Sequence, residues 1–204
     1  MGCTSNSDIK EENNSKPNVV FVIGGPGCGK GTQCKRIVKN FNYQSFSTGD
    51  LLRQYVKDKK DGFEEIDKQM KEGKLISSKT LIKVLKSYIV SCPNKKILVD
   101  GYPRSQENID VWEEEMKDDV VIKAALYIEV SNEEMKKRLL GRNEGRADDN
   151  EATIVKRLET FDKQTKPIVE YFERQGNLIK INGMKSVDEI SKEIARQFKS
   201  KGLA

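Results

Sequence analysis

The chain of 204 residues contains no histidine. This absence excludes catalytic triads that use an imidazole as base, metal sites built on histidine and histidine phosphorelays. Any chemistry must therefore rest on lysine, arginine, aspartate, glutamate and backbone groups.

Cysteine and long apolar runs are both scarce. The four cysteines are Cys3, Cys28, Cys34 and Cys92. They form no C-x-x-C pair, so neither a zinc knuckle nor a redox dithiol is indicated. The apolar runs, such as residues 19–23, are far shorter than the ~20 residues of a membrane-spanning helix, and the start of the chain lacks the apolar segment of an export signal. We expect a cytoplasmic protein with reduced thiols.

The composition is that of one globular domain, with 36% hydrophobic and 34% charged residues. The 37 basic and 32 acidic residues are interleaved along the chain, so the net charge of +5 is typical of a solvated surface. We predict no nucleic-acid partner.

Residues 1–17 are polar and end at Pro17, which predicts a flexible leader before a domain over residues 18–204. The first residues are compatible with acylation, because Gly2 is a candidate for myristoylation and Cys3 for palmitoylation. The sixth residue is Asn6 rather than the preferred serine or threonine. Two alternatives stay open for this segment: membrane association through acylated Gly2 and Cys3, or an ordinary disordered start.

From residue 18 onward, short apolar runs alternate with amphipathic stretches. The runs lie at residues 19–23, 97–99, 124–130 and 178–181, with a weaker one near 44–46. This alternation predicts an α/β fold with a five-stranded parallel sheet flanked by helices. Two sets of apolar residues at helical spacing are predicted to face the core: Leu81, Ile82, Leu85, Tyr88 and Ile89, and Ile154, Val155, Leu158 and Phe161.

A glycine-rich loop, GGPGCGKGT at residues 24–32, lies between the first predicted strand and an amphipathic helix. Its glycines allow successive backbone N–H groups to surround an anion, the helix N-terminus adds positive potential, and Lys30 supplies a charge for the β- and γ-phosphates. The hydroxyl that usually follows the lysine comes one residue later, at Thr32. Cys28 is interpreted as a small filler, the alternative being a thiol activated by the loop.

Arginines and one aspartate extend this phosphate site. A guanine-nucleotide switch is excluded, because no D-x-x-G occurs and residues 94–97 lack the final aspartate of N-K-x-D. Asp100 follows an apolar run, at the strand end where doubly wound sheets bind ligands. Six arginines suit a transition state with dispersed phosphoryl charge: Arg53, Arg104, Arg138, Arg142, Arg146 and Arg157.

Four ordered motifs resemble those of the nucleoside monophosphate kinases of the adenylate and UMP-CMP kinase type: residues 24–32, STGDLLR at 47–53, DGYPR at 100–104 and GRADDN at 145–150. The resemblance implies a P-loop NTPase-type sheet with a small helical acceptor-binding insert at about 47–77 and a short lid at about 141–151. It further implies a monomer that reversibly transfers the γ-phosphoryl group of Mg²⁺-ATP to a nucleoside monophosphate.

The same resemblance assigns residues to roles. ATP is assigned to Gly25, Gly27, Cys28, Gly29, Lys30, Gly31, Thr32, Arg138, Arg142 and Lys185. The acceptor is assigned to Thr48, Arg53, Lys74, Leu75, Ile76, Gly101, Arg104, Asn108, Arg146 and Arg157. The catalytic residues would be Lys30, Arg104, Arg142, Arg146 and Arg157. Asp100 would hold Mg²⁺ through water.

Two residues point to different acceptor bases. Asn108 matches the pyrimidine enzymes, and an amide can offer a donor or an acceptor to uracil or cytosine. Thr48 matches the adenylate kinases instead. The resemblance favours UMP and CMP; AMP as acceptor, and a lipid-anchored nucleotide sensor without significant turnover, are the alternatives.

Overall fold

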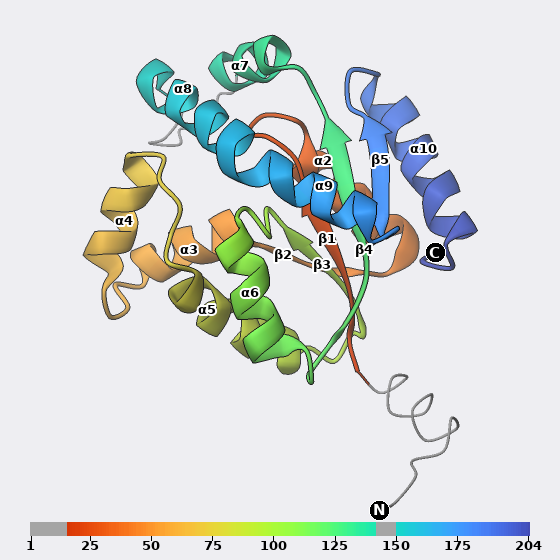
Figure 1. Ribbon diagram of the computed structural model, residues 1–204, viewed down its shortest axis with the longest axis horizontal. Helices are drawn as coiled ribbons and strands as arrows, with labels where there is room; N and C mark the ends of the chain where they lie inside the picture. Colours follow the sequence, from red (N-terminus) through yellow and green to blue (C-terminus); the bar gives the residue numbers. More distant parts are fainter. Residues whose placement is uncertain (1–15, 142–149) are drawn as a thin grey trace, which may run out of the picture.

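The computed structural model describes residues 16–141 and 150–204, and its centre is a parallel sheet (Figure 1). The strand order is β2-β3-β1-β4-β5, and every pairing is parallel. The bounds are β1 Asn18–Ile23, β2 Gln44–Ser47, β3 Lys96–Asp100, β4 Val121–Glu129 and β5 Leu178–Asn182. The predicted α/β class and five strands are confirmed, including the weak run near residue 44.

Helices connect the strands and pack on both faces of the sheet (Figure 1). They are α2 Lys30–Phe41, α3 Thr48–Lys57, α4 Phe63–Lys71, α5 Ser78–Val90, α6 Gln106–Met116, α7 Asn132–Leu140, α8 Glu151–Thr160, the π-helical turn η1 Phe161–Thr165, α9 Lys166–Arg174 and α10 Val187–Ser200. Residues 47–77, the predicted insert, hold α3 and α4. The predicted lid at 141–151 falls mostly outside the described residues.

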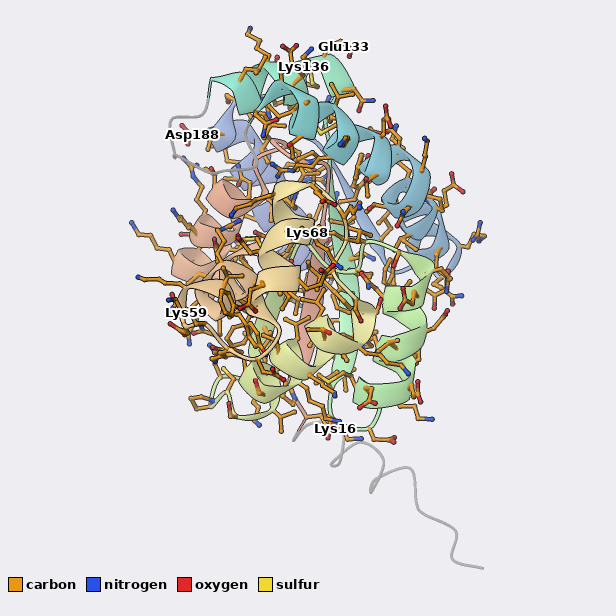
Figure 2. The ribbon with its side chains drawn as sticks, turned by 90° about the vertical axis from the view of Figure 1, so that its left-hand side faces the viewer. Lys16, Lys59, Lys68, Glu133, Lys136 and Asp188 are labelled. Carbon is orange, nitrogen blue, oxygen red and sulfur yellow. The ribbon has the colours of Figure 1, made fainter. Side chains whose placement is uncertain are left out.

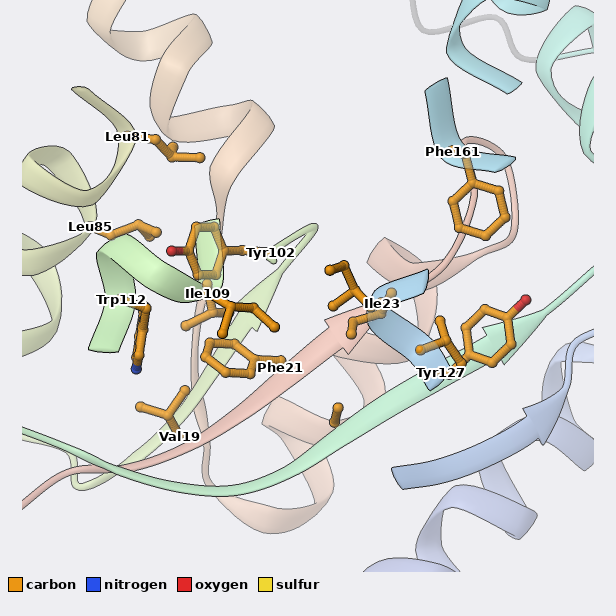
Figure 3. Packing of buried hydrophobic residues seen from close by; sticks show 14 of the residues in the cluster. Val19, Phe21, Ile23, Leu81, Leu85, Tyr102, Ile109, Trp112, Tyr127 and Phe161 are labelled. Atoms are coloured by element: carbon orange, nitrogen blue, oxygen red, sulfur yellow. The ribbon is translucent and has the colours of Figure 1, made fainter. Parts of the chain in front are cut away.

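The central strand β1 is buried on both faces, as its uninterrupted apolar sequence predicted. Val20 and Val22 pack in a cluster with α2 and α10, whereas Phe21 belongs to a larger cluster with α5, α6 and α9. The ring of Phe21 meets Trp112 of α6 edge-on at 4.8 Å between centroids (Figure 3). The sheet is thus held between two apolar layers.

The two predicted amphipathic helices are present, but one residue in each was wrongly placed in the core. Tyr88 is 38% exposed and Val155 40% exposed. The core stripe of α8 and η1 passes through Ile154, Leu158 and Phe161, so Val155 lies about 100° off it. Tyr88 lies at the margin of the core face of α5, where its ring is tilted against that of the partly buried Phe46 with 5.9 Å between centroids.

Charged side chains of both signs are spread over the surface. Figure 2 labels Lys68 on α4, Glu133 and Lys136 on α7, and Asp188 on α10. Within residues 16–141 and 150–204, no helix combines the length and the apolar character needed to cross a membrane. Of the predicted leader, residues 1–15 lie outside the described part of the chain, and with them Gly2 and Cys3. The backbone carbonyl of Pro17 accepts the N–H of Val121 at 2.9 Å.

Because all five strands run in one direction, their carboxyl ends meet at one edge of the sheet. The loop 24–29 follows β1 there, α3 follows β2, and residues 101–105 follow β3. The residues of three predicted motifs therefore lie at the same edge of the sheet.

Candidate functional site

A cleft of about 420 Å³ lies at this edge. Its walls come from the phosphate loop, the start of α3, the turn after α4, the loop after β3, and α8. Predicted site residues that line it are Gly27, Gly29, Lys30, Gly31, Thr32, Thr48, Arg53, Lys74, Leu75, Ile76, Asp100, Gly101, Arg104, Asn108, Arg138 and Arg157. Residues from widely separated parts of the chain thus share one cavity.

The cleft has a cationic lining. Seven basic and two acidic residues line it, the acidic ones being Asp50 and Asp100. Such an excess of positive charge in a concave site attracts polyanions, because the low-dielectric walls focus the field. The cleft suits a ligand with several phosphates.

The phosphate loop packs closely against α7, which requires glycine at two positions. A Cβ on Gly25 would lie 2.3 Å from the sulfur of Met135, and one on Gly27 would lie 2.8 Å from the backbone oxygen of the same residue. Gly27 also has φ of +80°. The ammonium of Lys30 spans the loop and donates to the carbonyls of Gly24 at 2.6 Å and Gly25 at 2.9 Å.

Arg104 is held at both its main chain and its side chain. Its backbone N–H donates to Oδ1 of Asn108 at 2.9 Å, and its carbonyl accepts the hydroxyl of Thr165 at 2.8 Å. Its Nε donates to the carbonyl of Gly101 at 2.6 Å, and a terminal nitrogen donates to the hydroxyl of Thr48 at 3.3 Å. These contacts hold the guanidinium in a defined position beside the cleft.

Asn108 and Thr48, the two residues predicted to discriminate bases, are both buried. Nδ2 of Asn108 donates to the hydroxyl of Ser78 at 2.7 Å. The Thr48 hydroxyl lies 3.1 Å from the carbonyl oxygen of Asp100 and 3.2 Å from that of Gly101, and donates to this backbone. The hydroxyl of Thr48 is thus oriented toward this backbone and toward Arg104.

Three further arginines approach the cleft from different elements. Arg138 of α7 donates to Glu134 at 2.8 Å and to the carbonyl of Gly183 at 3.1 Å, so it lies near the loop after β5. Arg53 of α3 pairs with Asp50. Arg157 of α8 packs beside the turn after α4, where a Cβ on Gly73 would lie 3.1 Å from its Cγ.

Five predicted site residues are not part of the described lining. Gly25 and Cys28 support the loop from behind; the Cys28 side chain is 1% exposed and its sulfur packs against Gly24, which fits the interpretation as a filler. Lys185 lies on the exposed loop after β5. Arg142 and Arg146 lie outside the described residues.

The cleft is also lined by residues that the sequence analysis did not assign to the nucleotide site. They are Pro26, Lys35, Ser47, Gly49, Asp50, Leu52, Met70, Gly73 and Leu81. Ser47 to Leu52 belong to the second motif, so its full extent was a usable signal. Lys35 follows Thr32 by about one helical turn on α2, which also could have been noticed. Met70 and Leu81 carry no polar signal and are recognised only from the folded structure.

The residues around Asp100 fit a Mg²⁺ ion that is held mainly by the phosphates of a bound nucleotide. Among residues 16–141 and 150–204, no group of three histidine, cysteine, aspartate or glutamate side chains could hold a metal alone. Mg²⁺ bound to a nucleotide usually needs only one or two carboxylates, with phosphates and water completing the octahedron. Asp100 lines the same cleft as Lys30 and Thr32 and offers such a carboxylate.

Comparison with known proteins agrees with this geometry. The family model for adenylate kinase matches residues 22–177. The chain is 43% identical over 183 residues to UMP-CMP kinase 1 of Oryza sativa subsp. japonica, covering 90% of this chain and 74% of the rice protein. It is 41% identical to UMP-CMP kinase 3 of Arabidopsis thaliana, covering 94% of each chain. It is 39% identical to UMP-CMP kinase of Homo sapiens, covering 92% of this chain and all of the human protein.

Proposed function

Because this chain belongs to the adenylate kinase family, it is a nucleoside monophosphate kinase that takes a phosphoryl group from ATP, and we propose that its acceptors are UMP and CMP. The observation that carries the pyrimidine assignment is the similarity to UMP-CMP kinases over at least 90% of the chain. AMP is the competing acceptor.

The surroundings of Asn108 support a pyrimidine. Its oxygen accepts from a backbone N–H and one Nδ2 hydrogen goes to Ser78. An amide nitrogen carries two hydrogens, so the second one can be donated into the cleft that Asn108 lines. On the edge that distinguishes the two bases, the acceptor is O4 in uracil and N3 in cytosine, and because these atoms are on adjacent ring positions, one donor directed between them can serve both bases.

We assign the phosphate loop to ATP. The backbone N–H groups from Gly27 to Thr32 would surround the β- and γ-phosphates, which would replace the loop carbonyls as partners of the Lys30 ammonium. Arg138 would contact ATP from α7, and Lys185 would lie beside the adenine. Gly25 and Cys28 would shape the loop behind the phosphates.

We assign the other end of the cleft to the acceptor. Arg53, Arg104 and Arg157 would bind its phosphate and the transferring group, together with Arg142 and Arg146, which lie outside the described residues. Thr48, Gly101 and residues 74–76 would enclose the nucleoside. No strong general base is required, because alignment and charge stabilisation supply most of the catalysis of phosphoryl transfer. The lack of histidine is consistent with such a mechanism.

We propose that Mg²⁺ is bound beside Asp100 through water, along with the ATP phosphates. The ion would neutralise charge on the β- and γ-phosphates as it develops. The position of Asp100 at the end of β3, in the wall of the cleft, supports this proposal. Its carboxylate would orient the water that the ion carries.

The remaining proposals concern the whole protein. Residues 47–77 would act as the acceptor-binding insert and residues 141–151 as the lid. The protein would act as a cytoplasmic monomer, with membrane association only if Gly2 and Cys3 are acylated. Intact mass after co-expression with an N-myristoyltransferase tests this last point, and an unchanged mass would count against acylation.

Steady-state kinetics test the acceptor assignment. ADP formation from Mg²⁺-ATP is measured with UMP, CMP, dCMP, AMP and GMP in turn, and kcat/KM is compared. Higher values for UMP and CMP than for AMP support the proposal. A preference for AMP would overturn it and make this chain an adenylate kinase with an unusual base contact.

A further inference from the structure

One continuous helical segment contains a π-helical turn at the cleft. α8, η1 and α9 follow one another without a break from Glu151 to Arg174, and η1 occupies Phe161–Thr165. A π turn inserts one residue into an α-helix and changes which side chains face a given neighbour; such turns are frequent at functional sites. The sequence carried no sign of this turn.

The first residue of the turn contacts the phosphate loop. Phe161 is 5% exposed, and its ring lies against the loop that follows β1 (Figure 3). A Cβ on Gly25 would stand 3.3 Å from Cδ1 of Phe161. The ring therefore limits how far the loop can move toward α8.

The last residue of the turn contacts the arginine loop. Thr165 is 4% exposed, and its hydroxyl donates to the backbone carbonyl of Arg104 at 2.8 Å. Between these two residues, Asp162 accepts a hydrogen bond from Asn132 at 2.7 Å. Burial alone would raise the pKa of Asp162, but the hydrogen bonds from Lys166 and Asn132 outweigh it and lower the pKa. The turn is thus fixed to α7 between its two contacts with the cleft.

We propose that Thr165 is a positioning residue for Arg104, and that the π turn sets the distance between the two phosphate-binding segments. The inference rests on the proposed role of Arg104. Thr165 is not among the described residues that line the cleft, and its hydroxyl donates its proton to the Arg104 carbonyl. It fixes the peptide from which the Arg104 side chain extends.

The hydrogen bonds of Arg104 explain why one hydroxyl matters. Asn108 holds the N–H of this residue and Thr165 holds its carbonyl, so the main chain is fixed on both sides. Without the Thr165 hydroxyl, the carbonyl loses its partner and the peptide can rotate to find another one. A rotation that moves the guanidinium by about 1 Å is enough to slow a transfer that depends on alignment.

The test compares Thr165→Val, which keeps the shape of the side chain, with Thr165→Ser, which keeps the hydroxyl. Thr160→Val is the matched control, because the Thr160 hydroxyl bonds within its own helix, to the carbonyl of Lys156 at 2.9 Å. We expect Thr165→Val to lower kcat by about 10- to 100-fold and to raise KM for the acceptor, while KM for ATP stays within about twofold. Thr165→Ser should restore most of kcat, and Thr160→Val should match the wild type.

Folding is checked by circular dichroism and by the unfolding midpoint of each variant. If Thr165→Val does not fold, Thr165→Cys replaces it, because a thiol has similar volume and is a much weaker donor. A folded variant without the hydroxyl that keeps both kcat and acceptor KM of the wild type would overturn the proposal. So would equal losses in Thr165→Val and Thr165→Ser.

Arg104→Ala separates this inference from the function on which it rests. If Arg104→Ala keeps the turnover of the wild type, the proposed role of Arg104 fails. If Arg104→Ala is inactive while Thr165→Val is fully active, only the role of Thr165 fails.

Discussion

The backbone N–H of Arg104 donates to the side-chain oxygen of Asn108 at 2.9 Å, so the residue proposed to bind phosphate and the residue proposed to contact the base are directly joined. A backbone N–H can only donate, so the amide atom that faces it must be oxygen. The nitrogen is then directed to Ser78, at 2.7 Å. This orientation presents Asn108 to the acceptor as a donor.

Ser78→Ala should weaken use of the acceptor without affecting ATP. The variant removes the partner of Nδ2, and a hydrogen bond of this kind contributes about 0.5–1.5 kcal/mol, so kcat/KM for UMP and CMP should fall by about 2- to 12-fold. Ser77→Ala is the control, because Ser77 is exposed and its side chain makes no cap hydrogen bond. Unchanged kcat/KM for the acceptors in Ser78→Ala would show that Asn108 does not need this partner.

Arg104→Ala should abolish nearly all turnover. An arginine that stabilises transferring phosphoryl charge contributes at least about 10³-fold to kcat. The control is Arg196→Ala, because Arg196 pairs only with Glu193 in the surface helix α10 and its side chain is 69% exposed. Initial rates of ADP formation measure both. A kcat within about tenfold of the wild type in Arg104→Ala would contradict the assigned role.

Gly101→Ala should lower kcat, and the loss of kcat should be larger than the loss of folding stability alone would cause. Gly101 has φ of +77°, and a Cβ there would lie 2.8 Å from a terminal nitrogen of Arg104 and 3.0 Å from the Thr48 hydroxyl. The added methyl group displaces the guanidinium. Gly202→Ala is the matched control. Gly202 has φ of +66°, and a Cβ added there would meet no described heavy atom within 4 Å apart from its chain neighbours.

Both glycine variants should lose about 1–2 kcal/mol of unfolding free energy, because alanine is strained at positive φ. Only Gly101→Ala should lose kcat in addition. Denaturant unfolding and initial rates, measured on the same preparations, separate these effects. Equal kcat values in the two variants would mean that the guanidinium tolerates the displacement.

Local patterns predicted the sheet and the phosphate loop, whereas the family resemblance supplied most of the other cleft residues. The apolar run of β1 indicates a strand buried on both faces, and the spacing of the phosphate loop indicates Lys30 as its phosphate-binding lysine. These features depend on neighbouring residues, so the sequence alone reveals them.

Contacts between distant parts of the chain could not be predicted in this way. Ser78 and Asn108 are 30 positions apart, and Thr165 and Arg104 are 61 apart. The sequence around Ser78 or Thr165 contains no pattern that distinguishes a buried hydroxyl with a hydrogen-bond partner from a hydroxyl at the surface. The π turn itself depends on packing against α7 and the phosphate loop, which no local preference encodes.

Alkaline pH should destabilise the protein through buried tyrosine. Tyr43 is 4% exposed and donates to the carbonyl of Leu203 at 2.8 Å, and burial raises its pKa to about 12 from the ordinary value of 10.0. A raised pKa in the folded state means that this stabilisation is complete below pH ~10 and is lost as the pH rises toward 12. In Tyr43→Phe, the unfolding free energy measured by denaturant titration should fall less steeply between pH 9 and 11.5 than it does in the wild type.

The control for this pH experiment is Tyr88→Phe at a partly exposed position. Burial also raises the pKa of Tyr127 to about 12, so part of the slope should remain in Tyr43→Phe. An identical pH dependence in the wild type and in Tyr43→Phe would contradict the assignment to Tyr43.

The acceptor is tested most directly by competition in a single reaction. ATP labelled at the γ-phosphate is supplied in limiting amount with Mg²⁺ and equal concentrations of UMP, CMP, AMP and GMP, and the labelled diphosphates are separated. Because all acceptors compete for the same enzyme, the ratio of labelled products formed at early times, before the reverse reaction redistributes the label, equals the ratio of kcat/KM values. The account predicts label mainly in UDP and CDP. Label mainly in ADP would contradict it.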